Sequence, residues 1–160
     1  MKVTHTATYA AAADEVRAML LDPAFREYAA RATGVLEVQA SVEETTGGHV
    51  VTIDQVQPTD GVPAFAKKFA GETTRAIVTE TWSSPEDGAV TVQTPGRPTE
   101  IHGSYVLEDL GDSTRIVFEG EVKAKVPLIK DKLERLVAQF FLEGKDGEQS
   151  AGNAWLAGDR

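Results

Sequence analysis

Residues 116–141, IVFEGEVKAKVPLIKDKLERLVAQFF, join a strand pattern to a long amphipathic helix pattern. In the first part, apolar side chains alternate with charged ones, and this period of two indicates a strand with one buried face. From Pro127, a good first-turn residue, the apolar side chains follow a helical period instead. They form one stripe, consisting of Ile129, Leu133, Leu136, Val137, Phe140 and Phe141. The stretch therefore predicts a half-buried antiparallel strand followed by a helix that packs on the sheet.

Two glycines, Gly103 and Gly120, occupy inward positions of their strands, beside Tyr105 and Phe118. A glycine inside a strand marks a bend or a close approach of backbones. We therefore expect a curved sheet that wraps the C-terminal helix. Because such a sheet does not close tightly on one helix, it leaves room for an apolar cavity.

The rest of the chain supplies the other elements of an α+β fold. Residues 2–10 alternate as a strand, two short helices meet at Asp22-Pro23, and Gly34 ends the second. Turn signals then divide residues 36–124 into six strands. We expect a helix-grip fold in one domain over residues 1–160: a curved seven-stranded antiparallel sheet, two short helices after the first strand, and the long C-terminal helix. Glycines between 144 and 147 predict a kink or a frayed tail in that helix.

Charge and composition exclude several classes of function. The 160 residues include 25 acidic and 16 basic side chains and no cysteine, for a formal charge of −9. This charge argues against nucleic acid as a partner, and the absence of cysteine fits a reducing compartment. The N-terminal residues have no signal-peptide core, and no stretch approaches the roughly 18 apolar residues of a spanning helix. We expect a cytoplasmic protein without integral membrane association.

The order of elements resembles the START-related superfamily, also called SRPBCC or helix-grip proteins, which includes lipid-transfer domains, pollen allergens and polyketide cyclases. The opening strand that ends at Tyr9-Ala10-Ala11, the helix ADEVRAML and Asp22-Pro23 carry the local similarity. Pro95-Gly96-Arg97-Pro98 and Val126-Pro127-Leu128 are similar to an uncharacterised actinobacterial family within that superfamily. The resemblance implies a cavity that binds a small hydrophobic molecule.

We predict that the ligand contacts lie between the sheet and the C-terminal helix, with aromatic side chains in the majority. The predicted contact residues are His5, Tyr9, Phe65, Phe69, Trp82, Tyr105, Phe118, Leu136 and Phe140. Phe65 and Phe69 lie four residues apart on a short helix between strands, where they could form a lid or seal a core. The three histidines lie on different strands without metal-ligand spacing, so we assign neither a metal nor a cofactor.

Two polar residues, His5 and Glu80, could have either a structural or a functional role. His5 shares the inward face of the first strand, where it could orient a ligand or transfer a proton; we favour a structural histidine bonded to a backbone carbonyl. Glu80 points inward if Trp82 does, and a buried carboxylate could serve as a general acid or base. We favour a position at the rim of the sheet, in water, because carboxylates are rarely buried without a partner.

Three functions follow, and the first is favoured. It is a carrier or sensor of a small hydrophobic molecule, without catalysis. The second is a cyclase- or dehydratase-like enzyme that uses His5, Tyr105 or Glu80 for proton transfer. The third is a protein-interaction module or chaperone cofactor, which a filled interior would favour. The sequence leaves the identity of the ligand, the openness of the cavity and the oligomeric state open.

Overall fold

Each strand of the sheet pairs antiparallel with its neighbours. The computed structural model describes residues 1–159, and in them the sheet order is β1-β7-β6-β5-β4-β3-β2. In chain order, the elements are β1 Lys2–Tyr9, α1 Ala13–Leu20, α2 Pro23–Ala32, β2 Glu37–Thr45, β3 Gly48–Pro58, α3 Ala64–Ala70, β4 Thr73–Trp82, β5 Asp87–Gln93, β6 Thr99–Asp109, β7 Thr114–Ala124 and α4 Lys130–Leu156. Within residues 1–159, no helix is long and apolar enough to cross a membrane.

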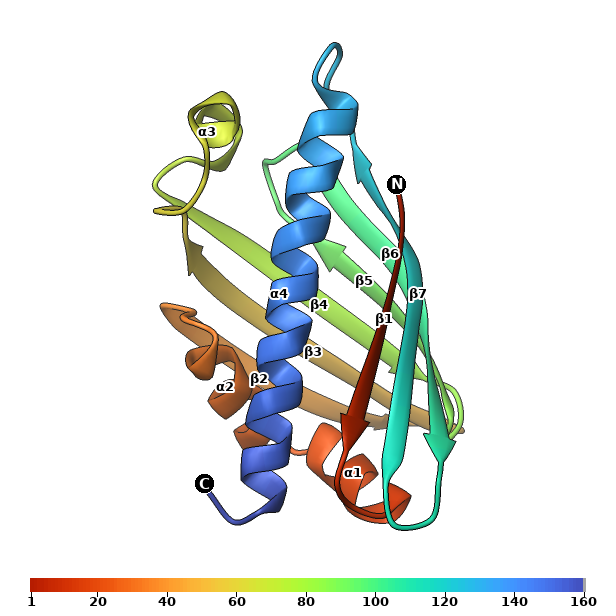
Figure 1. Ribbon diagram of the computed structural model, residues 1–160. Helices are drawn as coiled ribbons and strands as arrows, with labels where there is room; N and C mark the ends of the chain where they lie inside the picture. Colours follow the sequence, from red (N-terminus) through yellow and green to blue (C-terminus); the bar gives the residue numbers. More distant parts are fainter. Residues whose placement is uncertain (160) are drawn as a thin grey trace.

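The sheet curves around α4, which lies across its concave face (Figure 1). The helices α1 and α2 lie at the end of the molecule where α4 finishes, and α3 lies at the opposite end. The core fills the space between the sheet and these helices and includes Val16, Phe25, Val51, Val90 and Phe118. The expected helix-grip fold, with seven antiparallel strands and two short helices after the first strand, is confirmed.

The two inward glycines pair directly with each other across β6 and β7. A Cβ atom on Gly103 would lie 2.5 Å from the Phe118 ring, and one on Gly120 would lie at the same distance from that ring. The glycines therefore leave the space that the ring of Phe118 occupies. That ring in turn contacts Phe141 of α4, with 4.9 Å between the ring centroids. This contact joins the curved part of the sheet to the long helix.

The expected kink in α4 is wrong, and so is its expected start at Pro127. The helix begins at Lys130 and runs without interruption to Leu156. Two of its three glycines lie where it approaches other elements closely: a Cβ on Gly147 would lie 2.6 Å from Thr33, and one on Gly152 would collide with the Tyr9 ring. Each glycine costs about 1 kcal/mol of helix propensity, and packing against α2 and β1 outweighs this cost.

We expect Gly103→Ala to lower the free energy of unfolding by about 1–3 kcal/mol, because the methyl group displaces the Phe118 ring or the neighbouring backbone. The control is Gly144→Ala in α4, where an added Cβ meets nothing within 4 Å. That variant should be up to about 1 kcal/mol more stable, because alanine favours a helix. Urea unfolding measures both, and equal effects of the two substitutions would contradict the account of the glycine pair.

Candidate functional site

A buried ion pair joins α2 to the inner face of the sheet. Arg26 donates to both carboxylate oxygens of Glu80, at 2.6 and 3.1 Å, and to the carbonyl oxygen of Leu20 at 2.8 Å. The indole N–H of Trp82 donates to Glu80 at 3.0 Å. The side chains of Arg26 and Glu80 are each only 2% exposed. Trp82 and Glu80 both point inward, as two residues of the same phase must.

The favoured position of Glu80 at a wet rim is therefore wrong. The carboxylate is buried because Arg26, 54 residues earlier in the chain, supplies the partner that burial requires. Its three donors fix both oxygens, so the carboxylate is held as a structural acceptor.

The cluster extends to α4 through Glu148 and Lys145. Arg26 lies 3.3 Å from Glu148, and Lys145 lies 3.0 Å from the other oxygen of that carboxylate. Burial alone would raise the pKa of Glu148, but the charges of Lys145 and Arg26 outweigh it and lower the pKa below the usual range. The two cations and two anions of the cluster balance.

Tyr105 carries the one buried side-chain polar atom in residues 1–159 that has no hydrogen-bond partner, its hydroxyl oxygen. Burial raises the pKa of this hydroxyl to about 12, although the nearby Lys145 ammonium, 4.9 Å from the ring centroid, opposes the shift. The hydroxyl thus keeps its proton at neutral pH and can donate one hydrogen bond. A void of about 20 Å³ lies beside Tyr105, room for about one water molecule.

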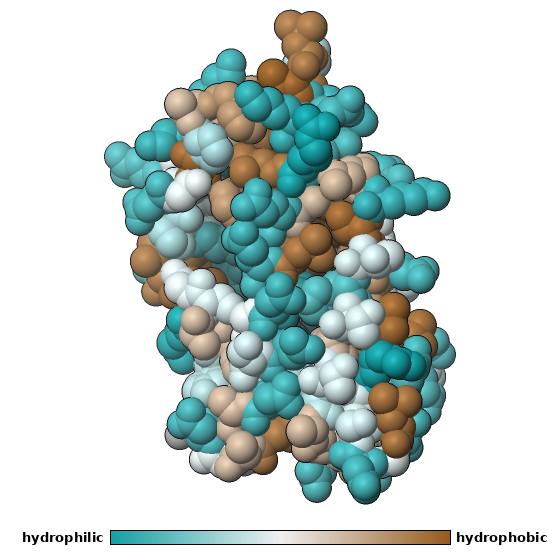
Figure 2. Space-filling view, viewed as in Figure 1, coloured by the Kyte–Doolittle hydropathy of each residue, from teal (hydrophilic) through white to brown (hydrophobic). Residues whose placement is uncertain are grey.

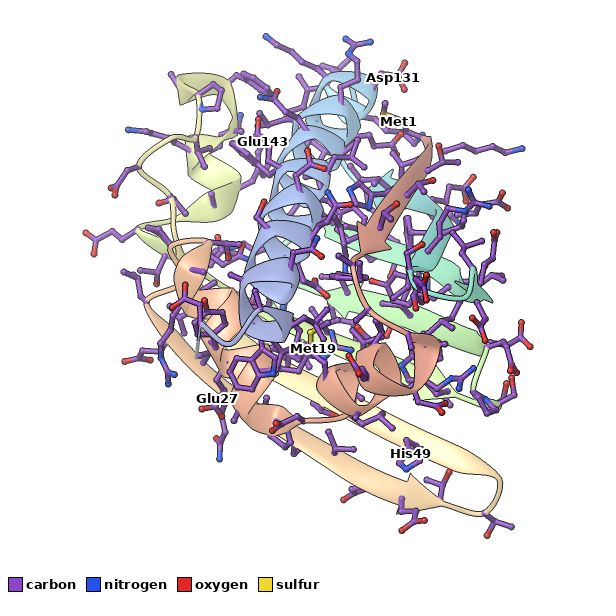
Figure 3. The ribbon with its side chains drawn as sticks, turned by 60° about the horizontal axis from the view of Figure 1, so that its bottom comes forward. Met1, Met19, Glu27, His49, Asp131 and Glu143 are labelled. Carbon is purple, nitrogen blue, oxygen red and sulfur yellow. The ribbon has the colours of Figure 1, made fainter. Side chains whose placement is uncertain are left out.

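A larger pocket, of about 380 Å³, opens at one end of the molecule, between α1, the β2–β3 hairpin and the β4–β5 turn. Figure 3 looks toward this end and shows His49 on the projecting hairpin. The pocket is lined by Arg17, Leu20, Leu21, Glu44, Thr45, Gly47, Gly48, His49, Trp82, Ser84, Pro85 and Leu107. Leu20 and Trp82 also line the inner void, so these two side chains separate the pocket from the polar cluster.

The structure brings five of the nine predicted contact residues together around the inner void. These five are His5, Tyr9, Trp82, Tyr105 and Phe118. The ring of Trp82 stacks on that of Tyr105, with 5.8 Å between centroids and 8° between planes. His5 is 2.8 Å from the carboxylate of Asp146 on α4. The favoured bond to a backbone carbonyl is therefore wrong.

The other four predicted contact residues lie elsewhere. Phe65, Phe69 and Leu136 pack in a second small core with Ala66, Ala124 and Leu133, at the end of the molecule that carries α3. This packing favours the core interpretation of the two phenylalanines over the lid. Phe140 is 38% exposed. Ligand contact at all nine positions stays a prediction.

Sequence reasoning missed Arg26, Lys145 and Glu148, and most of the pocket lining. Arg26 follows Phe25 on the buried side of α2, and a cation at such a position signals a buried partner. Lys145 and Glu148 lie in the glycine-containing part of α4 that the sequence suggested was frayed. No sequence pattern indicates the pocket, because its lining comes from chain segments that meet only in the folded protein.

Comparison with known proteins identifies the family. A family described as "Protein of unknown function (DUF2505)" matches residues 4–156, so the chain belongs to it. A search of curated proteins found no match.

Solved structures with the same fold cover nearly the whole chain at low identity. TTHA0849 from Thermus thermophilus is 16% identical, with a TM-score of 0.66 over 97% of this chain and 99% of that one. The Zhui aromatase/cyclase from Streptomyces sp. R1128 is 18% identical, with a TM-score of 0.62 over 100% and 99%. A START superfamily protein from Mycobacterium smegmatis is 13% identical, with a TM-score of 0.60 over 96% and 98%. These likenesses establish the START-like, polyketide cyclase-like fold.

Breaking the buried pair should destabilise the protein strongly. We expect Arg26→Met to lower the free energy of unfolding by about 3–5 kcal/mol, because Glu80 and Glu148 lose their shared cation inside the protein. The matched control is Arg75→Met, which removes a pair with Asp54 on the surface of the sheet. Its effect in the same urea titration should be much smaller. If the two variants lost a similar amount of unfolding free energy, the buried Arg26 cluster would contribute no more to stability than a surface ion pair.

Proposed function

We propose that the protein, as a single domain over residues 1–160, binds a small hydrophobic molecule as a carrier or sensor. The observation that supports this most directly is the end pocket of about 380 Å³, with Leu20, Trp82 and Leu107 in its lining. Ligand pockets commonly span about 300–1,000 Å³ and are lined mainly by apolar side chains. The START-like fold, which the solved structures share, supports the same function as an analogy.

The ligand of this proposal sits in the end pocket, with its inner end against Leu20 and Trp82. The alternative position, along α4, offers only the void of about 20 Å³ beside Tyr105. A ligand longer than the pocket reaches the Tyr105 hydroxyl only after the Trp82 ring moves. Apolar burial supplies the affinity in this arrangement, and the polar side chains Arg17, Glu44 and His49 lie in the lining where they can orient the ligand.

One observation favours a second candidate, a cyclase- or dehydratase-like enzyme. The protonated, unpartnered hydroxyl of Tyr105 is a hydrogen-bond donor that could polarise a carbonyl group of the ligand. The other two proposed groups are less suited, because Glu80 is held by Arg26 and Trp82, and His5 is bound to Asp146. Chemical change of a bound ligand that Tyr105→Phe abolishes would favour the enzyme over the carrier.

The filled interior beside α4 is the feature that fits the third function, a protein-interaction module. The open end pocket is what makes ligand binding the better-supported proposal. We further propose a cytoplasmic location, and the formal charge of −9 argues against a nucleic acid partner.

A neutral apolar fluorophore, N-phenyl-1-naphthylamine, tests the proposal. Trp82 and Trp155 are the only tryptophans, so a Trp155→Phe variant leaves one indole, in the pocket lining. We expect the probe to quench Trp82 fluorescence in that variant, because binding brings it against the ring. Leu21→Gln should weaken binding about tenfold, since it places an amide in the apolar lining.

The matched control is Leu36→Gln, because Leu36 is 59% exposed and outside the pocket lining. It should leave the dissociation constant unchanged. Native mass spectrometry of the protein with fatty acids and polyketides then identifies the ligand class. The proposal fails if neither the probe nor any apolar compound binds, or if both substitutions weaken binding equally.

A further inference from the structure

The loop between β7 and α4, residues 125–129, forms the tip of the molecule at the top of Figure 1. Figure 2 shows a hydrophobic projection at this tip, above hydrophilic atoms. Leu128 in this loop is fully exposed, with a relative accessibility of 104%. It is also the one non-glycine residue in 1–159 with a positive φ, +71°. Because a bulky residue rarely adopts this conformation, the backbone holds an apolar side chain in solvent at a cost in strain.

Basic side chains surround this tip. Seven of the 16 lysines and arginines lie in α3 and in residues 123–135: Lys67, Lys68, Lys123, Lys125, Lys130, Lys132 and Arg135. The two segments belong to one end of the molecule, since Lys132 lies over the Phe65 ring at 4.0 Å. The acidic residues of these two segments are Asp131 and Glu134. Glu134 is buried against the N-terminal amine and also pairs with Lys130, and Lys123 pairs with Glu121 at the edge of the segment. Two further acidic residues, Asp60 and Glu72, lie on either side of α3 in the sequence. The seven basic residues still outnumber the acidic ones at this end.

The basic tip contrasts with the formal charge of −9 of the whole chain. Acidic residues gather at the opposite end, with Asp14 and Glu15 on α1 and Glu43 and Glu44 on the β2–β3 hairpin. Clusters of basic and of acidic residues therefore lie at opposite ends of the molecule, although Asp14 is paired with Arg17. A negatively charged surface attracts the tip and repels the other end, which fixes the orientation of approach.

We propose that this tip docks onto an anionic lipid surface, with Leu128 inserted among the lipids and the lysines around it on the headgroups. Each signal alone is weak, but apolar insertion and attraction to anionic lipid act together at one place. A protein partner fits less well, because a stable protein interface needs a broad complementary area and this tip is a narrow projection. Neither Lys67 nor Lys125 forms an ion pair with a residue of the described chain, so both are available to headgroups.

Sedimentation with lipid vesicles tests the proposal on the intact protein. The vesicles are phosphatidylcholine alone, or with about one third phosphatidylglycerol. We expect binding to the anionic vesicles only, weakened by salt. Leu128→Gly should lower the partition coefficient about tenfold, since it removes the apolar insertion. Glycine also relieves the positive φ, so the variant keeps its fold, which thermal unfolding verifies. Lys67→Gln with Lys125→Gln should weaken binding and reduce its salt dependence.

The controls lie outside the tip. Leu110→Gly removes another exposed leucine, which is 47% exposed and lies in the β6–β7 turn at the opposite end of the molecule. Arg31→Gln removes an exposed cation from α2. Both should bind like the unchanged protein. The proposal is overturned if anionic vesicles do not bind, if Leu128→Gly binds as well as the unchanged protein, or if Leu110→Gly is equally impaired. Binding to heparin without binding to vesicles would also overturn it.

Discussion

The structure depends on one buried charge, the Arg26 guanidinium, placed where α2, α4 and the sheet meet. Two ions removed from water cost several kcal/mol each unless donors and acceptors satisfy them completely. Here Arg26 has Glu80 on β4, Glu148 on α4 and a backbone carbonyl as partners. The three elements must therefore keep one relative arrangement. A hydrophobic contact could slide by a fraction of an ångström, whereas this set of short polar contacts could not.

This arrangement also decides where a ligand has room. Glu80 accepts the indole N–H of Trp82, and the Trp82 ring stacks on Tyr105. The ring thus closes the interior, which keeps only a void of one-water size, and forms part of the open pocket at the end of the sheet. The unpaired Tyr105 hydroxyl lies just behind it. A buried polar group without a partner costs stability, and such exceptions concentrate at sites retained for function.

Much of the fold could be predicted from the sequence, because alternation and helical period are local signals. The inward positions of Tyr9, Trp82 and the two glycines are confirmed. Most of the failures concern long-range partners. The sequence predicts Glu80 in water because no nearby residue can pair with it. It predicts a kink in α4 because it does not reveal that Thr33 packs on Gly147. The end pocket is built by residues that meet only after folding, so no local pattern indicates it.

The central claim is that the polar cluster fills the interior and leaves the end pocket for the ligand. Leucine methyl resonances test it most directly, because leucines line both the pocket and the opposite core. On addition of an apolar ligand, the account predicts shifts at Leu20, Leu21 and Leu107, with Leu133 and Leu136 unchanged. Shifts at Leu133 and Leu136 with the pocket leucines unaffected would contradict it.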